Sequence, residues 1–87
     1  MHGIDIDSHY LDNGLEVKVN GNTMTSPYTL QNGDVIIVTI TSYIFKINDE
    51  LYYSDETFNL SNQDIHITIE CEPSLGITTT TINYTES

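Results

Sequence analysis

The 87-residue chain contains no arginine, no tryptophan and no alanine, and it has only two lysines. Its 13 acidic residues therefore give a formal net charge of -11 at pH 7. Binding to DNA, RNA or an anionic membrane surface depends on clustered lysine and arginine. The composition disfavours nonspecific binding to any of these polyanions. The absence of alanine, together with many isoleucines and threonines, favours strands over helices.

Cysteine and long apolar runs are equally scarce. The only cysteine, Cys71, cannot form a disulfide within the chain, and the acidic neighbours Glu70 and Glu72 disfavour its thiolate, so a structural role is expected. The longest apolar run, residues 35–40, is far shorter than the roughly 18 residues of a membrane span. The first seven residues lack the basic and apolar regions of a signal peptide. We expect one small domain, 1–87, with neither a signal peptide nor a transmembrane segment.

Apolar residues recur with the period of two that is typical of half-buried strands, as in Leu15, Val17 and Val19. Asn-Gly pairs at 13–14, 20–21 and 32–33 favour tight turns between strands. No segment has a helical period. The pattern predicts an all-β fold, a β-sandwich or a small barrel. The expected strands are 3–9, 15–20, 23–30 with a break near Pro27, 34–42, 43–48, 51–54, 64–72 and 76–85.

The chain also contains an internal repeat. Residues 17–21 (VKVNG) recur as 45–49 (FKIND), and residues 28–37 (YTLQNGDVII) recur as 58–67 (FNLSNQDIHI), with offsets of 28 and 30. We interpret units of about 15–42 and 43–72, followed by the C-terminal strand 76–85, as a pseudo-repeat. Asp34 and Asp64 are each expected to hold a turn by accepting hydrogen bonds from backbone N–H groups.

The pattern of strand, Asn-Gly turn and Tyr28-x-Leu30-x-Asn32-Gly33-Asp34-Val35-x-Ile37 resembles immunoglobulin-like β-sandwich modules of tailed-phage virion proteins and bacterial surface proteins. The resemblance covers residues 14–72. It implies a small immunoglobulin-like β-sandwich of about seven to eight antiparallel strands, which serves as a spacer, decoration or appendage and lacks catalytic residues. The chain lacks the Cys, Trp and Cys pattern of antibody-type domains.

Residues for catalysis or metal binding form no recognisable motif, and we expect no enzyme activity and no cofactor. His66 alternates with isoleucines and is interpreted as a solvated strand residue. A site combining His2 and His9 with Asp5 or Asp7 has no ligand spacing to support it. Residues 5–16 do not form an EF-hand calcium loop, because Tyr10 occupies the position at which that loop requires a glycine. A looser calcium site stays open, with the carboxylates of Asp49, Glu50, Asp55 and Glu56 as its ligands.

Two segments are candidates for binding a protein partner. Residues 35–40 are apolar on both faces, which predicts a central strand or a strand covered by another chain. Residues 76–84 have high β-propensity and no charge, so at a sheet edge they would add to a partner's strand. The expected partner-binding residues are Ile77, Thr79, Thr81, Ile82, Tyr84, Ile36, Val38 and Ile40.

The leading hypothesis is a structural protein of the virion, a capsid decoration or a tail component, whose partners are protein subunits of a larger assembly or further copies of itself. The alternative from another class is an acidic inhibitor that mimics DNA, for which a net charge of -11 is suited. A carbohydrate-binding module also stays open, with Tyr28, Tyr43, Tyr52 and Tyr53 as stacking rings.

Overall fold

The computed structural model describes residues 1–6, 14–24, 27–52 and 55–87, and it describes only the backbone of 42–44, 51–52 and 70–75. Every regular element within these residues is a strand, which confirms the predicted all-β class. The strands are β1 (Gly3–Asp5), β2 (Leu15–Val19), β3 (Asn22–Thr23), β4 (Tyr28–Thr29), β5 (Val35–Ile47), β6 (Glu50–Tyr52), β7 (Glu56–Ser61) and β8 (Ile65–Thr85).

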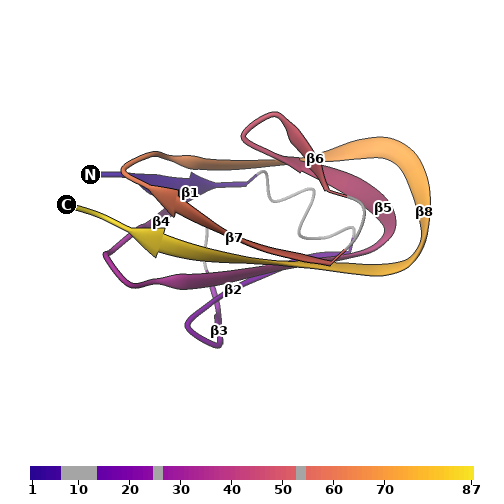
Figure 1. Ribbon diagram of the computed structural model, residues 1–87. Coiled ribbons are helices and arrows are strands. Elements are labelled where there is room, and N and C mark those ends of the chain that lie inside the picture. The colour runs from indigo at the N-terminus through magenta and orange to yellow at the C-terminus, as the bar shows by residue number, and fades with distance from the viewer. Residues whose placement is uncertain (7–13, 25–26, 53–54) are drawn as a thin grey trace.

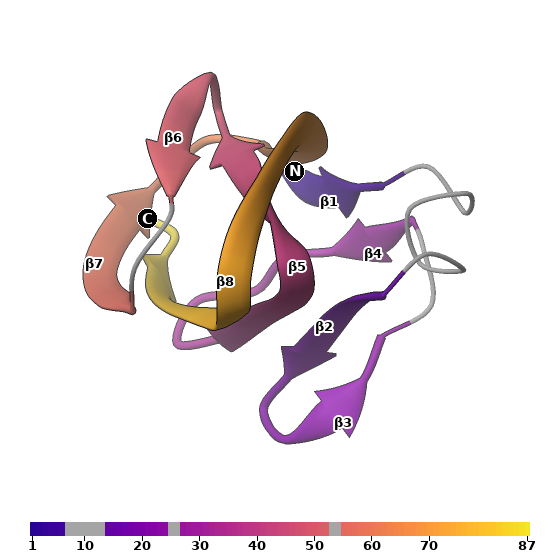
Figure 2. The same ribbon diagram turned by 90° about the vertical axis from the view of Figure 1, so that its right-hand side faces the viewer.

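Two long strands, β5 and β8, pair along their length, bend together and so contribute to both layers of a β-sandwich (Figure 1). Layer one has the strand order β3-β2-β5-β8-β7 and uses residues 35–41 of β5 and 77–85 of β8. Layer two has the order β6-β5-β8-β1-β4 and uses residues 45–47 and 65–69 of the same two strands. Figure 2 shows the bent pair with β2 and β3 on one side of it and β6 and β7 on the other.

The bend lies where the sequence predicts two strand boundaries. The register of β5 against β8 shifts between Thr41 and Tyr43 and again between Tyr43 and Phe45. Pro73 lies opposite Tyr43, and Gly76 has a φ of 98°, a conformation that glycine adopts without strain. The predicted strand pairs 34–42 with 43–48, and 64–72 with 76–85, are therefore single strands that change layer at a bulged bend.

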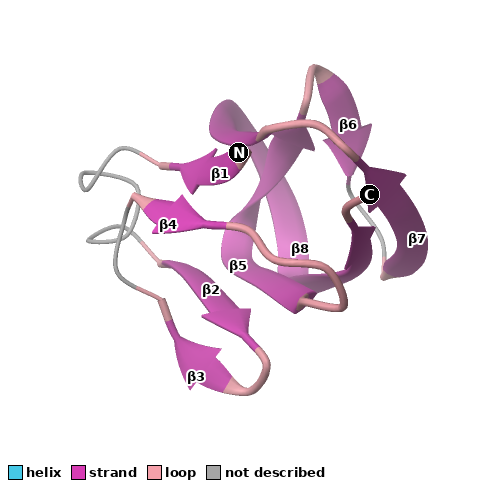
Figure 3. Cartoon of the chain, turned by 90° about the vertical axis from the view of Figure 1, so that its left-hand side faces the viewer, coloured by secondary structure: helices cyan, strands magenta, loops and turns pink. Residues whose placement is uncertain are grey.

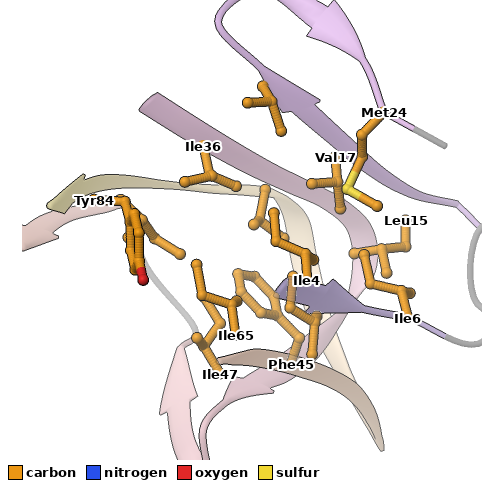
Figure 4. Close-up of a cluster of buried hydrophobic side chains, with 14 of the residues drawn as sticks. Ile4, Ile6, Leu15, Val17, Met24, Ile36, Phe45, Ile47, Ile65 and Tyr84 are labelled. Atoms are coloured by element: carbon orange, nitrogen blue, oxygen red, sulfur yellow. The ribbon is translucent and has the colours of Figure 1, made fainter. Parts of the chain in front are cut away.

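The core lies between the layers and is formed by the alternate residues that the period of two predicts (Figure 4). Layer one contributes Val17, Ile36 and Val38, and layer two contributes Phe45 and Ile65, all of them fully buried. Burying one such side chain stabilises the fold by about 1.5–3 kcal/mol. The complete buried apolar set is Ile4, Ile6, Leu15, Val17, Val19, Met24, Leu30, Ile36, Val38, Ile40, Phe45, Ile47, Ile65, Ile67, Ile82 and Tyr84.

The strand pairing differs from the predicted antiparallel arrangement in two places. β1 and β7 both run parallel to β8, whereas the remaining pairs are antiparallel. Strand β7 also falls outside the predicted strands, which skip residues 55–63. β7 lies in layer one, whereas β8 begins in layer two and returns to layer one only after its bend, so these two consecutive strands run parallel. Figure 3 shows β1 beside β4, its antiparallel partner in layer two.

The repeat in the sequence corresponds to two equivalent turns, which we call corners, at Asn20 and at Asn48. Asn20 and Asn48 both have left-handed backbones, with φ of 52° and 49°. The Asn20 N–H donates to Val35 O and its Oδ1 accepts from Val35 N–H, both at 2.9 Å. Asn48 makes the same two bonds with His66, at 2.9 and 2.8 Å. Each asparagine thus closes a strand pair in the same way.

The equivalence corrects the alignment of the repeat by one residue. The sequence matches Val35 with Ile65, whereas the hydrogen bonds of the corners match Val35 with His66. The shift is needed because successive side chains of a strand point to opposite faces. The alignment from sequence would match the fully buried Ile36 with the exposed His66.

The two predicted aspartate turns have different outcomes. Asp34 is buried and holds its turn as expected, since its Oδ2 accepts the Gln31 N–H at 2.9 Å. Asp64 instead accepts the Gly3 N–H at 2.9 Å and so ties β1 to the start of β8. The prediction for Asp64 is wrong because its acceptor is used between strands rather than within a turn.

Candidate protein-binding face

The outer surface of layer one is built mainly from threonine and other β-branched residues. The outward positions of β5 and the C-terminal half of β8 alternate with buried core residues on the same strands. They are half-buried or exposed, and none of them carries a charge. We call this surface the threonine face, and its members are Val35, Ile37, Thr39, Thr41, Ile77, Thr79, Thr81 and Asn83.

The register of the strands arranges these side chains in rows across the layer. Thr39 lies opposite Thr79, and Ile37 lies opposite Thr81. Thr57 of β7 extends the second row, because it is the partner of Thr81. Directly opposite side chains on one face lie about 4.5–5.5 Å apart at Cβ, so each row forms a continuous surface of methyl and hydroxyl groups.

Charged residues lie at both margins of the threonine face. On one margin, Glu16 and Lys18 of β2 face outward, and Lys18 Nζ lies 3.6 Å from Glu16 Oε1, so this pair cancels its own charge. On the other margin, Asp55 and Glu56 lie beside Thr79 and Thr81. None of the eight members of the face is itself charged, in a chain whose net charge is -11. The outer surface of layer two differs, because Asp5 and His66 lie side by side on it. A surface of uncharged, β-branched side chains is suited to contact with another protein, because the centres of protein–protein interfaces contain few charged residues.

Ile77 is the clearest apolar feature of the face. Its side chain is 65% exposed, and apart from Met1 it is the one large hydrophobic residue left exposed within the described part of the chain. It lies opposite Thr41, next to the bend of β5 and β8. An isolated exposed isoleucine needs no explanation, but one set in a neutral face marks where a partner would bury most apolar surface.

The structure separates the eight predicted partner-binding residues into two groups. Ile77, Thr79 and Thr81 lie on the threonine face. The other five are buried in the core and are not accessible to a partner, so their assignment to a binding surface is corrected: Ile82, Tyr84, Ile36, Val38 and Ile40. The expectation that residues 35–40 form a central strand is confirmed, since β5 lies between β2 and β8.

Sequence reasoning missed the outward residues of β5, namely Val35, Ile37, Thr39 and Thr41. A signal for them is present: the polar residues Thr39 and Thr41 share the odd-numbered phase, which indicates that this phase faces outward. The apolar pair Val35 and Ile37 in the same phase concealed it.

The final strand is not a sheet edge. Residues 80–85 of β8 pair with residues 56–61 of β7 on the side away from β5. Just before them, Asp55 Oδ1 accepts the Thr79 N–H at 2.8 Å. The proposed strand addition at residues 76–84 is therefore corrected, because the chain itself covers most of this backbone.

The histidines and carboxylates form no metal centre within the described residues. No group of three or more His, Cys, Asp or Glu side chains among them is placed to hold an ion, and this applies to the calcium site considered at Asp49, Glu50, Asp55 and Glu56. His66 is exposed on a strand, as predicted. His9 and Asp7 lie outside the described residues, and the side chain of Cys71 is not described.

His2, Tyr84 and Glu86 form a polar cluster at the end of the sandwich where both termini lie (Figure 1). His2 Nδ1 lies 3.0 Å from Glu86 Oε1, and the Tyr84 hydroxyl donates to the same oxygen at 2.8 Å. The hydrogen bonds from His2 and then from Tyr84 lower the pKa of Glu86 below its usual value. Burial, followed by the bond to Glu86, raises the pKa of Tyr84. The cluster ties the first strand to the last and leaves no free nucleophile.

Of the four rings considered for carbohydrate stacking, the described one, Tyr28, is partly buried against the core. Tyr28 pairs with Ile4 on the inner side of layer two, and its hydroxyl donates to Asp34 Oδ2 at 3.3 Å. Burial, followed by the Asp34 charge, raises the pKa of Tyr28. The Tyr43 and Tyr52 side chains are not described, and Tyr53 lies outside the described residues.

Comparison of the chain with family models, with curated proteins and with solved structures finds no match. The described residues include no helix that could cross a membrane.

Proposed function

We propose that this chain is a non-enzymatic structural component of a virion, a capsid decoration or a tail part, which binds its neighbours through the threonine face. The observation that carries the proposal is a neutral, β-branched face with Ile77 exposed on it, in a chain of net charge -11. Self-repulsion keeps such a chain soluble, and a single neutral face then directs association to one surface.

The resemblance to immunoglobulin-like modules of phage particles supports the virion assignment, and so does the repeat built around Asn20 and Asn48. Both features concern turns and core positions, which serve a scaffold rather than a reaction. The outer surface of a β-layer also suits a subunit contact, because its neighbouring strands offer a continuous area.

The test is an affinity capture from the native source, with bound proteins identified by mass spectrometry at low and moderate salt. The Ile77→Asp variant places a charge at the most exposed apolar position of the face. His66→Asp is the matched control, since it adds the same charge to an exposed strand position of layer two. Circular dichroism melts check that both variants fold.

We expect the wild-type chain and His66→Asp to capture capsid or tail subunits, and this binding should persist at moderate salt. The Ile77→Asp variant should no longer capture them. If Ile77→Asp captures the same proteins as the wild type, the threonine face is not the binding surface. Capture of a nuclease or polymerase that is lost with salt would replace the proposal with the DNA-mimic alternative, because a mimic acts through its exposed carboxylates.

A further inference from the structure

Strand β7 is the last strand on its side of layer one among the described residues. It pairs with β8 on one side and with no other strand among the described residues. Its six residues span about 20 Å at the usual rise of a strand. The other edge strands are shorter: β3 and β4 have two residues each and β6 has three. Edges of two or three residues offer little backbone to an incoming chain, so β7 is where strand addition has a template.

Three of the devices that protect natural edge strands are absent from β7, although its first residue, Glu56, is charged. Its sequence, ETFNLS, has no lysine and no proline, and its register against β8 runs from Glu56 to Ser61 without a bulge. Proteins usually place a lysine, a proline or a bulge on a long edge to prevent pairing with other chains. An edge that omits all three is either covered by a partner or prone to aggregation.

A hollow lies beside this edge on the inner side of the layer. Phe58 and Leu60 of β7 are only partly buried against the core, and they line the hollow together with Ile47 of layer two. Its volume is about 350 Å³, and polar residues complete its wall: Asn48, Glu50, Asn59 and Gln63. Because directly opposite residues of neighbouring strands share a face, a strand added to β7 would place alternate side chains over Phe58 and Leu60.

We propose that the β7 edge and this hollow bind an extended segment of a partner protein, with apolar side chains at alternate positions and lysine or arginine beside them. The charges select this occupant. Asp55 and Glu56 are exposed at the start of the edge, and no cationic residue lines the hollow within the described part of the chain. A second copy of the chain carries the same net charge of -11 and would bring acidic edges together. The site is separate from the threonine face and goes beyond the proposed function.

The experiment uses the full chain and a probe peptide of alternating valine and threonine with lysines at both ends. Backbone amide chemical shifts are followed by NMR as the peptide is added up to about 1 mM, the weak end of specific recognition. We expect shifts at residues 47–50 and 56–63, and slower amide exchange in β7.

Two further peptides carry N-methyl groups, one on its valine amides and the other on its threonine amides. Only one side of an added strand pairs with β7, so one of the two should lose binding and the other should retain it. Equal effects from both peptides, or no shifts with the parent peptide, overturn the proposal. Shifts confined to the threonine face overturn it as well.

A charge reversal tests the choice of partner. Glu56→Lys should weaken binding of the lysine-flanked peptide by about two- to tenfold, because it replaces an attraction at the edge with a repulsion. Glu16→Lys makes the same change of net charge on β2, at an exposed position of another strand, and should leave the affinity within about twofold. Equal weakening by both variants would mean that the peptide is held only by net charge, and the edge site would be wrong.

Discussion

Thr80 lies on β8 with its side chain fully buried, and its Oγ1 is the one buried side-chain oxygen or nitrogen of the described residues without a hydrogen-bond partner. Burying a hydroxyl without a partner costs about 1–3 kcal/mol in mutational studies. Valine has almost the same shape and replaces the hydroxyl by a methyl group, which adds about 0.8 kcal/mol of favourable burial. We therefore expect Thr80→Val to raise the free energy of unfolding by about 1–3 kcal/mol.

The assay is urea denaturation at pH 7 followed by circular dichroism, with the slope m checked for constancy. In a domain of this size each kcal/mol corresponds to a rise in Tm of roughly 4–8 °C. Thr79→Val is the control, since the Thr79 side chain is half-buried on the outer surface and its replacement should change stability by less than about 0.5 kcal/mol. A Thr80→Val protein that is no more stable than the wild type would refute the reasoning, because its hydroxyl would then have a partner.

Three other substitutions test the packing and the polar contacts. Gly3→Ala should lower stability by about 1–3 kcal/mol in thermal melts, since its Cβ would lie 2.8 Å from the Tyr28 carbonyl oxygen; unchanged stability would show that β1 and β4 can separate. Asp34→Asn should cost about 1–3 kcal/mol by urea titration, because the amide lacks the second acceptor for the donors that the buried carboxylate binds, and a neutral effect would contradict that hydrogen-bond assignment. The hydrogen bond from His2 lowers the pKa of Glu86, so the stability that Glu86 contributes is present above its usual pKa of 4.5 and is lost as the pH falls below that value. The decrease in the free energy of unfolding between pH 7 and pH 3 should therefore be smaller in Glu86→Gln than in the wild type. Equal decreases in both proteins would argue against this contact.

The alternation of apolar residues locates strands well where it is long. The segment predicted as 15–20 is observed as Leu15–Val19, because three apolar residues alternate there with polar ones. β7 escapes the same logic, since Phe58 and Leu60 are its only apolar residues and asparagine separates them. Its place in the fold is decided by pairing with a distant strand, which local pattern does not encode.

Orientation within the long strands is harder to predict than their existence. Thr78 and Thr80 are buried, whereas Thr79 and Thr81 face outward, and a run of identical residues carries no phase. Threonine fits both environments because it has a methyl group and a hydroxyl. The phase is set by the register of β8 against β5, so the candidate face could be predicted only in part.

The passage of β5 and β8 through both layers has a mechanical consequence. In a sandwich whose layers are separate sheets, one sheet can slide or peel while the other stays intact. Here a displacement of layer one pulls on the same two backbones that hold layer two, and covalent bonds carry the load across the bend. The two layers are therefore expected to open in a single cooperative step, with similar hydrogen-exchange protection of the β5 amides on both sides of Tyr43. A force applied to one face of the sandwich would then reach the opposite face without a hinge between them.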